Sequence, residues 1–505
     1  MVNSITNYVD VLIVGAGLSG IGAACHLQRE CPNKTVALLE GRSAIGGTWD
    51  LFRYPGIRSD SDMYTMGYKF KPWREAKSIA DGPSILNYIR ETASDFGIDK
   101  KIRFNQKVVK ASWSSETARW TVESRHSETG EPSTMTCNFL MMCSGYYRYD
   151  TGYTPEFPGI EQFQGTIIHP QKWPEGLDYA GKRVVVIGSG ATAVTLVPSM
   201  AETAKHVTML QRSPTYMVSL PGSDAIAIAL RRVLPERAVY ALTRWKNVLF
   251  GMLIYQLSQR RPELVKRLIK KQMRKELGPE YDVDRDFTPP YNPWDQRMCL
   301  VPDSDFFIAM RKGRASILTD QIDTFTPTGI KLKSGQHLDA DIIVTATGLE
   351  LLALGGASLE VDGEAVQLNK SINYKGCMLT GVPNLSFVFG YTNASWTLKA
   401  DLLSTYVCRL LNYMDKHSYR QVTVRLNDSE VKELPLLDLT SGYIQRAIEH
   451  FPRQGSKLPW RLYQNYFFDT MMIRFGSIKD DALEFKRAES PAAVGKVATA
   501  SISSS

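Results

Sequence analysis

Apolar runs followed by a glycine-rich turn and a helix-forming stretch occur twice along the chain. The first run covers residues 9–14 and leads to a helical pattern over residues 21–28. The second covers residues 183–187, and its helical pattern extends to Met200. Short apolar runs bounded by turn signals are typical of buried strands, so each unit predicts a strand, a tight turn and a helix. Two such units predict the α/β class with two Rossmann-like dinucleotide-binding domains.

The first turn carries Gly15, Gly17 and Gly20 in the spacing G-x-G-x-x-G. Glycines at this spacing let the backbone turn sharply and approach a pyrophosphate, whose charge meets the amide N–H groups at the start of the helix. A second strand, expected over residues 35–39, ends at Glu40, whose carboxylate suits a ribose diol. The N-terminal position and Glu40 favour FAD as the first nucleotide.

The second turn carries Gly188, Gly190 and Ala193, and alanine is allowed at the third position of this fingerprint. Where the first unit has an acidic residue, the second has Arg212 followed by Ser213. An arginine can pair with a ribose 2′-phosphate that a carboxylate would repel, so we expect NADPH rather than NADH. The alternative is that Arg212 is a solvated surface residue.

Two further short strands are expected at residues 139–143 and 342–346, each ending in a small residue and a glycine. They bracket the second nucleotide unit, which indicates that the chain leaves the FAD domain, builds the NADP domain and returns. The FAD domain is therefore expected to be discontinuous, with one segment at residues 1–150 and another at 341–487. Between them we expect a linker at 151–180 and the NADP domain at 181–340 with a helical insert at 224–290, and after them a disordered tail at 488–505.

The linker contains a second pattern just ahead of the second fingerprint. It reads Phe163-x-Gly165-x-x-x-His169-x-x-x-Trp173-Pro174. A lone histidine is more often a satisfied structural residue than a ligand or catalyst, and we expect no acid–base role for His169.

Residues 46–60 are rich in glycine, proline and aromatic residues, and they include Gly47, Thr48, Trp49 and Asp60. This composition predicts an ordered loop rather than a helix or strand. Taken singly, Trp49 would be a core anchor and Asp60 a turn residue.

Composition and the spacing of cysteines and histidines limit the classes of protein to which the chain can belong. The chain has 505 residues, of which 43% are hydrophobic, and so has room for two or three domains with a large core. Its seven cysteines are scattered and never spaced C-x-x-C, which disfavours the disulfide reductases that share a two-nucleotide architecture. The seven histidines are isolated, so no metal site is expected.

Residues 1–8 are polar and lack the features of a secretory signal. The longest mid-chain apolar run, residues 248–257, is far shorter than the about 20 residues of a membrane span. We therefore expect a cytoplasmic protein. The formal net charge of +8 is smaller than the excess within residues 225–275 alone, so the rest of the chain is slightly acidic and no nucleic-acid-binding surface is expected.

Residues 225–275 hold thirteen lysines and arginines against two glutamates. The pattern is helical, and the apolar positions expected along one broad face are Leu264, Val265, Leu268, Ile269 and Met273. Two interpretations fit: a substrate lid with a solvated basic face, or peripheral contact with an anionic membrane that supplies apolar substrates.

Together these motifs resemble type I Baeyer–Villiger monooxygenases over about residues 9–487. The linker pattern from Phe163 to Pro174 and the loop at residues 46–60 match two signatures of that family at every specified position. Residues 47–62, 291–297 and 391–399 are similar to one subgroup, which includes ethionamide-activating monooxygenases and flavoproteins of long-chain alkane degradation.

The resemblance implies FAD and NADPH as cofactors and O2 as cosubstrate, with ketones converted to esters. It also implies that Arg297 is the active-site arginine, a cation that does not deprotonate, and that Asp60 orients it through a charge-assisted pair. For His169 it implies a hinge contact between domains. One position departs from the family: Gln296 stands where many relatives have a lysine that helps to hold the 2′-phosphate, which weakens the expected preference for NADPH.

We therefore expect a Baeyer–Villiger monooxygenase that acts on apolar ketones, with sulfide or thioamide oxidation as a side activity. The first alternative is a heteroatom monooxygenase or a long-chain alkane oxidiser with the same cofactors. The second is a redox-sensing flavoprotein that oxygenates nothing.

Overall fold

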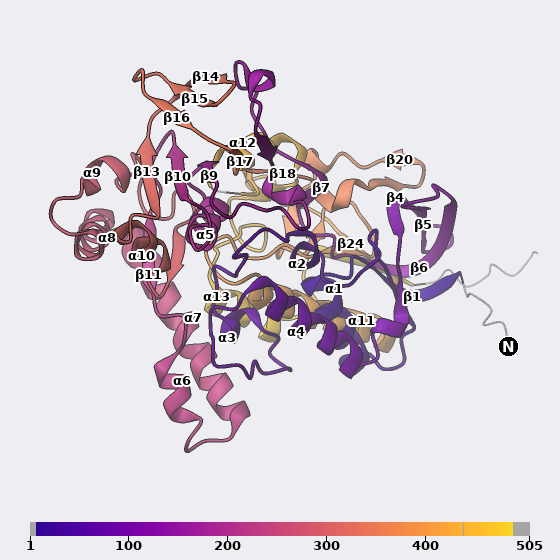
Figure 1. Ribbon diagram of the computed structural model, residues 1–505. Coiled ribbons are helices and arrows are strands. Elements are labelled where there is room, and N and C mark those ends of the chain that lie inside the picture. The colour runs from indigo at the N-terminus through magenta and orange to yellow at the C-terminus, as the bar shows by residue number, and fades with distance from the viewer. Residues whose placement is uncertain (1–6, 438, 488–505) are drawn as a thin grey trace, which may run out of the picture.

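The computed structural model describes residues 7–437 and 439–487, so the tail expected at residues 488–505 lies outside them. A mixed sheet forms the centre of the first domain (Figure 1). Its strands are β1 (Tyr8–Val14), β2 (Val36–Leu39), β3 (Ile102–Arg103), β4 (Gln106–Ser114), β5 (Arg119–His126), β6 (Pro132–Met142), β19 (Ser358–Val361), β20 (Glu364–Ala365) and β23 (Leu385–Phe387). The order is β20-β19-β4-β5-β6-β1-β2-β3, with β23 also paired with β6. The first apolar run is thus a strand buried inside a sheet, parallel to both neighbours.

The second sheet is parallel throughout and has the order β13-β10-β9-β17-β8. Its strands are β8 (Thr166–Ile168), β9 (Arg183–Ile187), β10 (His206–Gln211), β13 (Ala315–Thr319) and β17 (Ile342–Thr345). Helices α5 (Ala191–Met200) and α10 (Asp305–Arg311) pack beside it. The expected α/β class with two Rossmann-like units is confirmed.

The chain passes between the two sheets at two places that lie side by side. Strand β7 (Tyr147–Gly152), on the way out, pairs antiparallel with β18 (Leu349–Leu351), on the way back. The chain returns to the first sheet after β17, which lies between β9 and β8 in the second sheet. Strand β8, which belongs to the expected linker, is therefore also part of the second sheet. The second sheet therefore begins at Thr166 and ends at Thr345, outside the expected bounds 181–340 on both sides.

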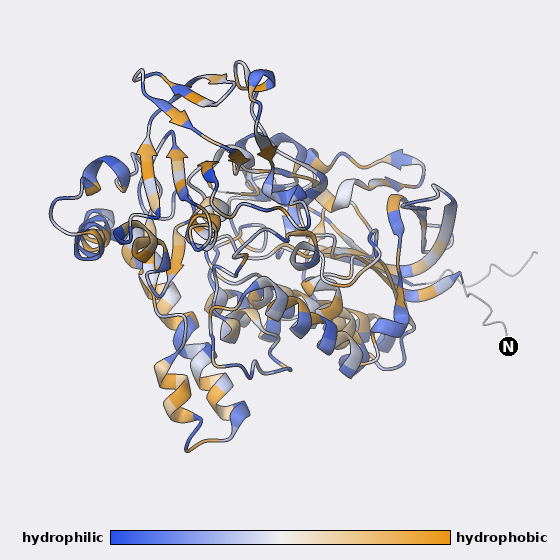
Figure 2. Ribbon diagram, viewed as in Figure 1, coloured by the Kyte–Doolittle hydropathy of each residue, from blue (hydrophilic) through white to orange (hydrophobic). Residues whose placement is uncertain are grey.

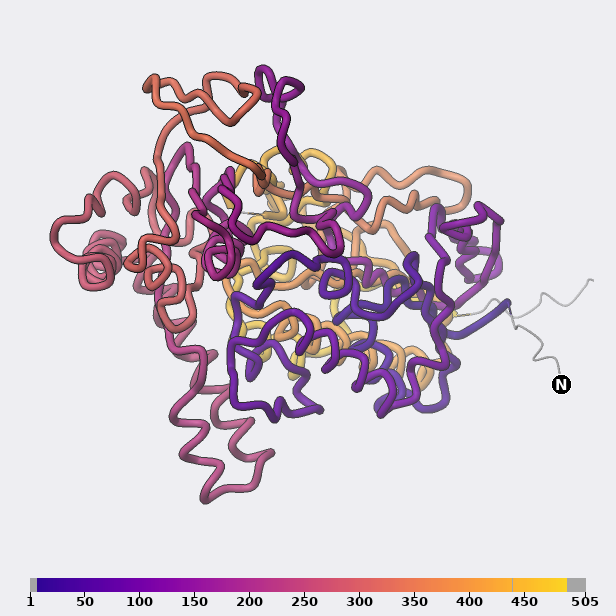
Figure 3. The backbone as a smooth tube through the Cα atoms, viewed as in Figure 1, coloured from indigo at the N-terminus to yellow at the C-terminus, as the bar shows by residue number. Residues whose placement is uncertain are grey.

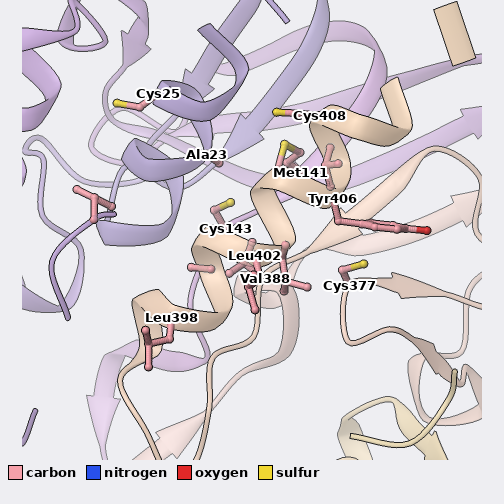
Figure 4. Packing of buried hydrophobic residues seen from close by; sticks show 14 of the residues in the cluster. Ala23, Cys25, Met141, Cys143, Cys377, Val388, Leu398, Leu402, Tyr406 and Cys408 are labelled. Carbon is pink, nitrogen blue, oxygen red and sulfur yellow. The ribbon is translucent and has the colours of Figure 1, made fainter. Parts of the chain in front are cut away.

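Helices cover the first sheet. Helix α1 (Leu18–Glu30) packs against α4 (Gly82–Asp95) and α11 (Trp396–Lys416). Buried side chains of α11 join the cluster that contains the end of β6, and Figure 4 shows Leu398, Leu402 and Cys408 on α11 near Met141 and Cys143. All seven cysteines lie in the described segments of the chain as buried free thiols.

The expected helical insert is a set of helices that projects from the body of the molecule (Figure 3). It follows β11 (Met217–Leu220), which pairs with β12 (Cys299–Pro302), and consists of α6 (Ala225–Leu230), α7 (Glu236–Arg260), α8 (Pro262–Leu277) and α9 (Val283–Asp286). The helix expected around Leu264 is α8; of its five apolar positions, Val265, Ile269 and Met273 are buried, whereas Leu264 and Leu268 are exposed. None of the described helices is long and apolar enough to cross a membrane.

The loop expected at residues 46–60 holds one turn of helix, α2 (Thr48–Leu51), so the expectation of no helix there is wrong. Gly47, with φ +55°, stands before this turn and changes the chain direction, which the composition alone did not reveal. A second short helix, α3 (Met63–Met66), follows and is capped by the Asp62 side chain.

Smaller elements complete the two domains. They are β14 (Ile322–Thr326), β15 (Gly329–Leu332), β16 (His337–Asp339), β21 (Asn373–Tyr374), β22 (Met378–Leu379), β24 (Tyr419–Val424), β25 (Glu433–Pro435), α12 (Gly442–Gln445), β26 (Arg453–Gly455), α13 (Tyr466–Asp469), a π-helical turn (Thr470–Phe475) and β27 (Leu483–Arg487). Of these, α12 matters most for the site, because it lies against the crossing strand β18.

Candidate active site

A cavity of about 1430 Å³ joins the two domains, which is larger than the roughly 300–1,000 Å³ of a pocket for one ligand. Both fingerprint turns line it. From the sequence-predicted residues its walls include Gly15, Gly17, Glu40, Gly47, Thr48, Trp49, Asp60, Gly188, Gly190, Arg212, Ser213 and Arg297. The structure thus brings together residues spread over more than half of the chain.

We call each glycine-rich fingerprint turn, together with the start of the helix that follows it, a cradle. In the first cradle the glycines leave no room for a side chain. Gly15 has φ +103°, and a Cβ there would lie 2.6 Å from the carbonyl oxygen of Cys143. A Cβ on Gly20 would lie 1.8 Å from the oxygen of Gly15, so this glycine allows the helix to approach the strand. No side chain caps α1, whose N-cap residue is Gly17, and the first amides of the helix therefore remain for an anion.

Glu40 closes this cradle at the end of β2. Its two carboxylate oxygens accept hydrogen bonds from the backbone N–H groups of Ala16, at 2.7 Å, and Arg42, at 2.9 Å. Burial raises the pKa of Glu40, although these hydrogen bonds and the nearby Arg42 act in the opposite direction. The side chain is fixed at the edge of the turn, where a ribose beside the pyrophosphate would lie.

The turn at Thr48 packs directly onto this cradle. Gly46 and Gly17 form a backbone bridge, and the hydroxyl of Thr48 lies 3.2 Å from that of Tyr149. Beneath them the buried Asp50 accepts hydrogen bonds from Arg42, at 2.7 Å, and from Arg90, at 3.0 Å. The buried Nε of Arg42 has no partner among the described residues, which leaves a donor beside the cradle.

The second cradle repeats the geometry of the first. Gly188 has φ +132°, and a Cβ there would lie 2.3 Å from the carbonyl oxygen of Ala346. Gly190 is the N-cap of α5, and a Cβ on it would meet nothing within 4 Å. Ala193 is fully buried in the first turn of that helix. Arg212, just past β10, is exposed, lines the cavity and has no ion pair among the described residues.

Arg297 reaches the cavity from the loop before β12. Its Nε donates a hydrogen bond to the carbonyl oxygen of Thr392 at 3.3 Å. Burial lowers the pKa of this guanidinium, but neighbouring tyrosines and Asp60 outweigh that effect and raise the pKa above its ordinary value. The tyrosines are Tyr146, Tyr147 and Tyr443. Arg297 is therefore a permanent cation in this cavity.

Asp60 faces the same cavity from the first domain. Burial raises its pKa, and the charges of Arg297 and then Arg58 oppose that shift. The two described groups Asp60 and Arg297 are not within ion-pair distance, so the direct pair implied by the family resemblance is not formed here. Arg58 instead forms an ion pair with Asp305 of α10, which ties the loop of the first domain to the second.

The linker residues lie at the crossing strands. His169 Nε2 lies 3.2 Å from the carbonyl oxygen of Gly348, and its Nδ1 accepts a hydrogen bond from the backbone N–H of Gln171. A Cβ on Gly152 of β7 would fall 1.9 Å from the imidazole ring. Burial lowers the pKa of His169, which favours a neutral ring donating from Nε2. His169 therefore contacts both crossing segments, near Gly152 and Gly348, and its role as a hinge residue stays a prediction.

The other linker positions are packing residues. Phe163 is buried against Phe325, with ring centroids 6.5 Å apart. A Cβ on Gly165 would lie 2.5 Å from the carbonyl oxygen of Asp341, and Trp173 packs half-buried against the core of the second domain.

Sequence reasoning missed one wall of the cavity, which comes from the α12 segment. Ser441, Tyr443 and Arg446 line the cavity beside Arg297, and the Arg446 guanidinium lies 3.4 Å from the ring centroid of Tyr153. The segment is held by Thr440, whose backbone N–H donates to the carbonyl oxygen of Asp295 at 3.1 Å. These residues carry no local motif, so only the fold reveals them.

Two dinucleotide cradles that open into one cavity, with a permanent cation at its wall, define an oxidoreductase that uses two nucleotide cofactors.

Residues 9–228 match the family described as flavin-binding monooxygenase-like. Among similar proteins, the FAD-containing monooxygenase EthA of Mycobacterium tuberculosis (strain ATCC 25618 / H37Rv) is 54% identical over 491 residues, which cover 97% of this chain and 100% of EthA. The probable FAD-binding monooxygenase AlmA of Acinetobacter baylyi is 49% identical over 482 residues, which cover 95% and 96% of the two chains. The chain belongs to the flavin-binding monooxygenase-like family, which confirms the expected class of enzyme.

Solved structures with the same fold are more distant in sequence. An oxidized steroid monooxygenase bound to NADP has a TM-score of 0.75 at 22% identity, covering 95% of this chain and 100% of that one. The open structure of cyclohexanone monooxygenase has a TM-score of 0.73 at 19% identity, with the same coverage. The two-domain architecture is therefore shared along almost the whole chain.

Proposed function

We propose that this protein is an FAD- and NADPH-dependent Baeyer–Villiger monooxygenase that converts apolar ketones to esters, with sulfide or thioamide oxidation as a side activity. In the main reaction a ketone, O2, NADPH and a proton give an ester, water and NADP⁺. The observation that carries the proposal is the position of Arg297, a permanent cation in the cavity that both fingerprint turns line.

The two cradles fit these cofactors. Gly15, Gly17 and the Glu40 carboxylate would hold FAD, and Gly188, Gly190 and Arg212 would hold NADPH. When bound, FAD supplies the electron-transfer and oxygen-activating chemistry. In support, EthA is described as FAD-containing and the steroid monooxygenase of the same fold as bound to NADP.

Arg297 supplies a charge that the ketone reaction needs. A carbonyl oxygen gains negative charge when its carbon is attacked, and a fixed guanidinium beside it stabilises that charge. An arginine also keeps a neighbouring oxygen nucleophile anionic, because the guanidinium itself does not give up its proton. Removing a single stabilising donor of this kind typically lowers kcat by about 10²–10³-fold.

Asp60 is a positioning residue in this proposal. It lines the same cavity as Arg297 and acts on it through charge rather than through a hydrogen bond. The Arg58 to Asp305 pair holds the Asp60 loop against the second domain. We expect Asp60→Asn to lower kcat while leaving the Kd of NADPH unchanged, because only the field at Arg297 is altered.

The aromatic wall supports an apolar substrate. Tyr146 stacks on Trp396 with ring centroids 5.1 Å apart and an interplanar angle of 17°, and both side chains line the cavity. Such rings provide large apolar area near the charged group. This arrangement favours a ketone with aliphatic or aryl substituents.

The test is product analysis with labelled oxygen. The FAD-loaded enzyme is given NADPH, ¹⁸O2 and a panel of ketones and sulfides, and products are analysed by mass spectrometry. One labelled atom in an ester supports the proposal. Sulfoxides without any ester would indicate a heteroatom monooxygenase, terminally oxidised alkanes an alkane oxidiser, and NADPH oxidation without oxygenated product a redox-sensing flavoprotein.

Arg297 variants then separate these functions. Arg297→Ala should lose ester formation by at least about 10²-fold while NADPH oxidation continues. Arg420→Ala, at an exposed arginine on β24, is the matched control and should behave as wild type. Undiminished ester formation by Arg297→Ala would overturn the role assigned to Arg297.

A further inference from the structure

The outer face of helix α7 is apolar although it points to solvent. Five large side chains of α7 are between 42% and 63% exposed, namely Leu242, Trp245, Leu249, Phe250 and Leu253. On a surface helix the face away from the core is normally polar. Leu242, Trp245, Leu249 and Leu253 follow one another at spacings of three and four residues, so they form one stripe along the helix.

This stripe continues onto neighbouring elements. On the α6 side it meets Ile226, which is 56% exposed, and Val233 in the turn before α7, which is 76% exposed. On the other side the ring of Trp245 lies 5.7 Å from that of Tyr466, the first residue of α13. The exposed Phe467, Met471 and Phe475 follow in that segment. We call the exposed apolar residues of α6, α7 and the turn between them the insert tip.

The insert tip cannot turn inward to hide these side chains. The opposite face of α7 carries Arg244, which is buried and donates from Nη1 to the carbonyl oxygens of Tyr64, at 2.8 Å, and Gly67, at 2.7 Å. Its Nη2 lies 3.4 Å from the Asp401 carboxylate. This anchoring fixes the orientation of the helix, so the apolar stripe is held outward.

The shape and charge of the insert tip indicate what covers it. Figures 1 and 2 show α6 and the first half of α7 extending beyond the body of the molecule, with hydrophobic colouring along the projecting helices. Arg232 and Arg237, on either side of the turn, are exposed and form no ion pair with a described residue, whereas Glu236 pairs with Arg74. The free charge at the insert tip is therefore positive.

We propose that the insert tip is a membrane-docking surface that inserts its apolar side chains at the interface of an anionic lipid bilayer. A projecting apolar edge flanked by cations is the pattern of surfaces that lie in a lipid interface. A second copy of this chain is disfavoured, because a two-fold contact would bring the same arginines against each other. The acidic headgroups of a bilayer supply the opposite charge. The proposal rests on this surface and not on the ketone chemistry.

The test uses the full-length, FAD-loaded protein and flotation with vesicles. Vesicles of phosphatidylcholine and phosphatidylglycerol in equal amounts provide the anionic surface, and pure phosphatidylcholine vesicles provide the neutral one. Wild type should float with the anionic vesicles, and the binding should weaken as salt rises.

The double variant Leu249→Glu/Leu253→Glu should lose at least about tenfold in binding, because two apolar side chains no longer enter the interface. Leu458→Glu, at a leucine of the first domain that is 42% exposed, is the matched control and should bind as wild type.

Two further variants make the result decisive. Val233→Glu changes a residue in a turn, where a substitution disturbs folding least, and it should also reduce vesicle binding. The FAD content and the melting temperature of each variant verify that it is folded. Arg232→Glu/Arg237→Glu should abolish the preference for anionic vesicles. Failure of wild type to float, or equal flotation of the Leu249→Glu/Leu253→Glu variant, would overturn the proposal. Analytical ultracentrifugation tests the other occupant. If the wild type does not bind vesicles but is a dimer, and the Leu249→Glu/Leu253→Glu variant is a monomer, the proposal is overturned and the surface is assigned to a second copy of the chain. None of these outcomes depends on ester formation.

Discussion

Arg244 of the helical insert and Asp401 of α11 form a buried ion pair, with 3.4 Å between guanidinium Nη2 and carboxylate Oδ2. Asp401 also accepts a hydrogen bond from the backbone N–H of Lys69, at 2.9 Å, and lies 3.3 Å from His26 Nε2 of α1. The insert starts and ends in the second domain, yet this network fastens its longest helix to the first. The insert is thus a strap across the two domains rather than a free lid.

Removing the cation of this strap should destabilise the protein strongly. Arg244→Met keeps much of the side-chain volume but leaves the buried Asp401 with His26 as its one ion-pair partner among the described residues. Breaking a buried pair by removing one member typically costs about 3–5 kcal/mol. Urea unfolding followed by circular dichroism measures the change, with the exposed Arg237→Met as control. A loss below about 0.5 kcal/mol, the size of an ordinary surface substitution, would contradict the strap.

The same network should make stability depend on pH through His26. Burial disfavours its charged form, but hydrogen bonds to Asp401 and Glu30 outweigh burial and raise the pKa of His26 to about 9. A raised histidine pKa contributes stability that is fully present below the unfolded pKa of about 6.5 and is lost as pH rises through the folded value.

The expected loss between pH 7 and pH 9.5 is on the order of 2 kcal/mol in wild type. His26→Gln should be less stable at pH 7 and should show a correspondingly smaller decline over this interval. Unfolding curves at several pH values give the two slopes. Parallel slopes for wild type and variant would mean that His26 is not charged in the folded protein.

The two glycines of the second cradle should separate folding from cofactor binding. Gly188→Ala places a Cβ 2.3 Å from the Ala346 carbonyl oxygen at φ +132°, and we expect a loss of stability of about 1–3 kcal/mol. Gly190→Ala meets nothing within 4 Å in the protein, but its methyl group enters the space of the pyrophosphate. Gly190→Ala should therefore keep the melting temperature and raise the KM for NADPH. Equal effects of both variants on both quantities would argue against this division.

The strand–turn–helix units were predictable because their signals are local. The run that ends before Gly15 and the run that ends before Gly188 are each a strand followed directly by the helix that completes the cradle. The wall that carries Tyr443 was not predictable, because it meets Tyr146 only after almost 300 residues of chain. Such a pairing depends on how the discontinuous domain closes, and no spacing rule encodes it.

The helical insert shows what a periodic pattern leaves open. Leu264 and Leu268 have the spacing of core positions but are exposed, since only the stripe of Val265 and Ile269 faces the second domain. Periodicity identifies an apolar face and does not identify its partner. Leu249 of the insert tip belongs to the apolar run at residues 248–257, which the sequence showed only to be too short for a membrane span.

Arg212 should determine the choice between NADPH and NADH. Arg212 follows the last residue of β10, as Glu40 follows the last residue of β2. It lines the cavity, and no carboxylate of the described residues forms an ion pair with it. A ribose 2′-phosphate is the natural partner of such a guanidinium. Arg212→Ala should raise the KM for NADPH by about 10–100-fold, equivalent to roughly 1.4–2.7 kcal/mol of lost binding, and leave the KM for NADH almost unchanged.

Gln296→Lys adds a second cation at the cavity wall and should shift the KM for NADPH in the opposite direction. Steady-state kinetics with both nucleotides measure these changes. A parallel rise of both KM values in Arg212→Ala would mean that Arg212 holds some other group of the nucleotide, because NADH lacks only the 2′-phosphate.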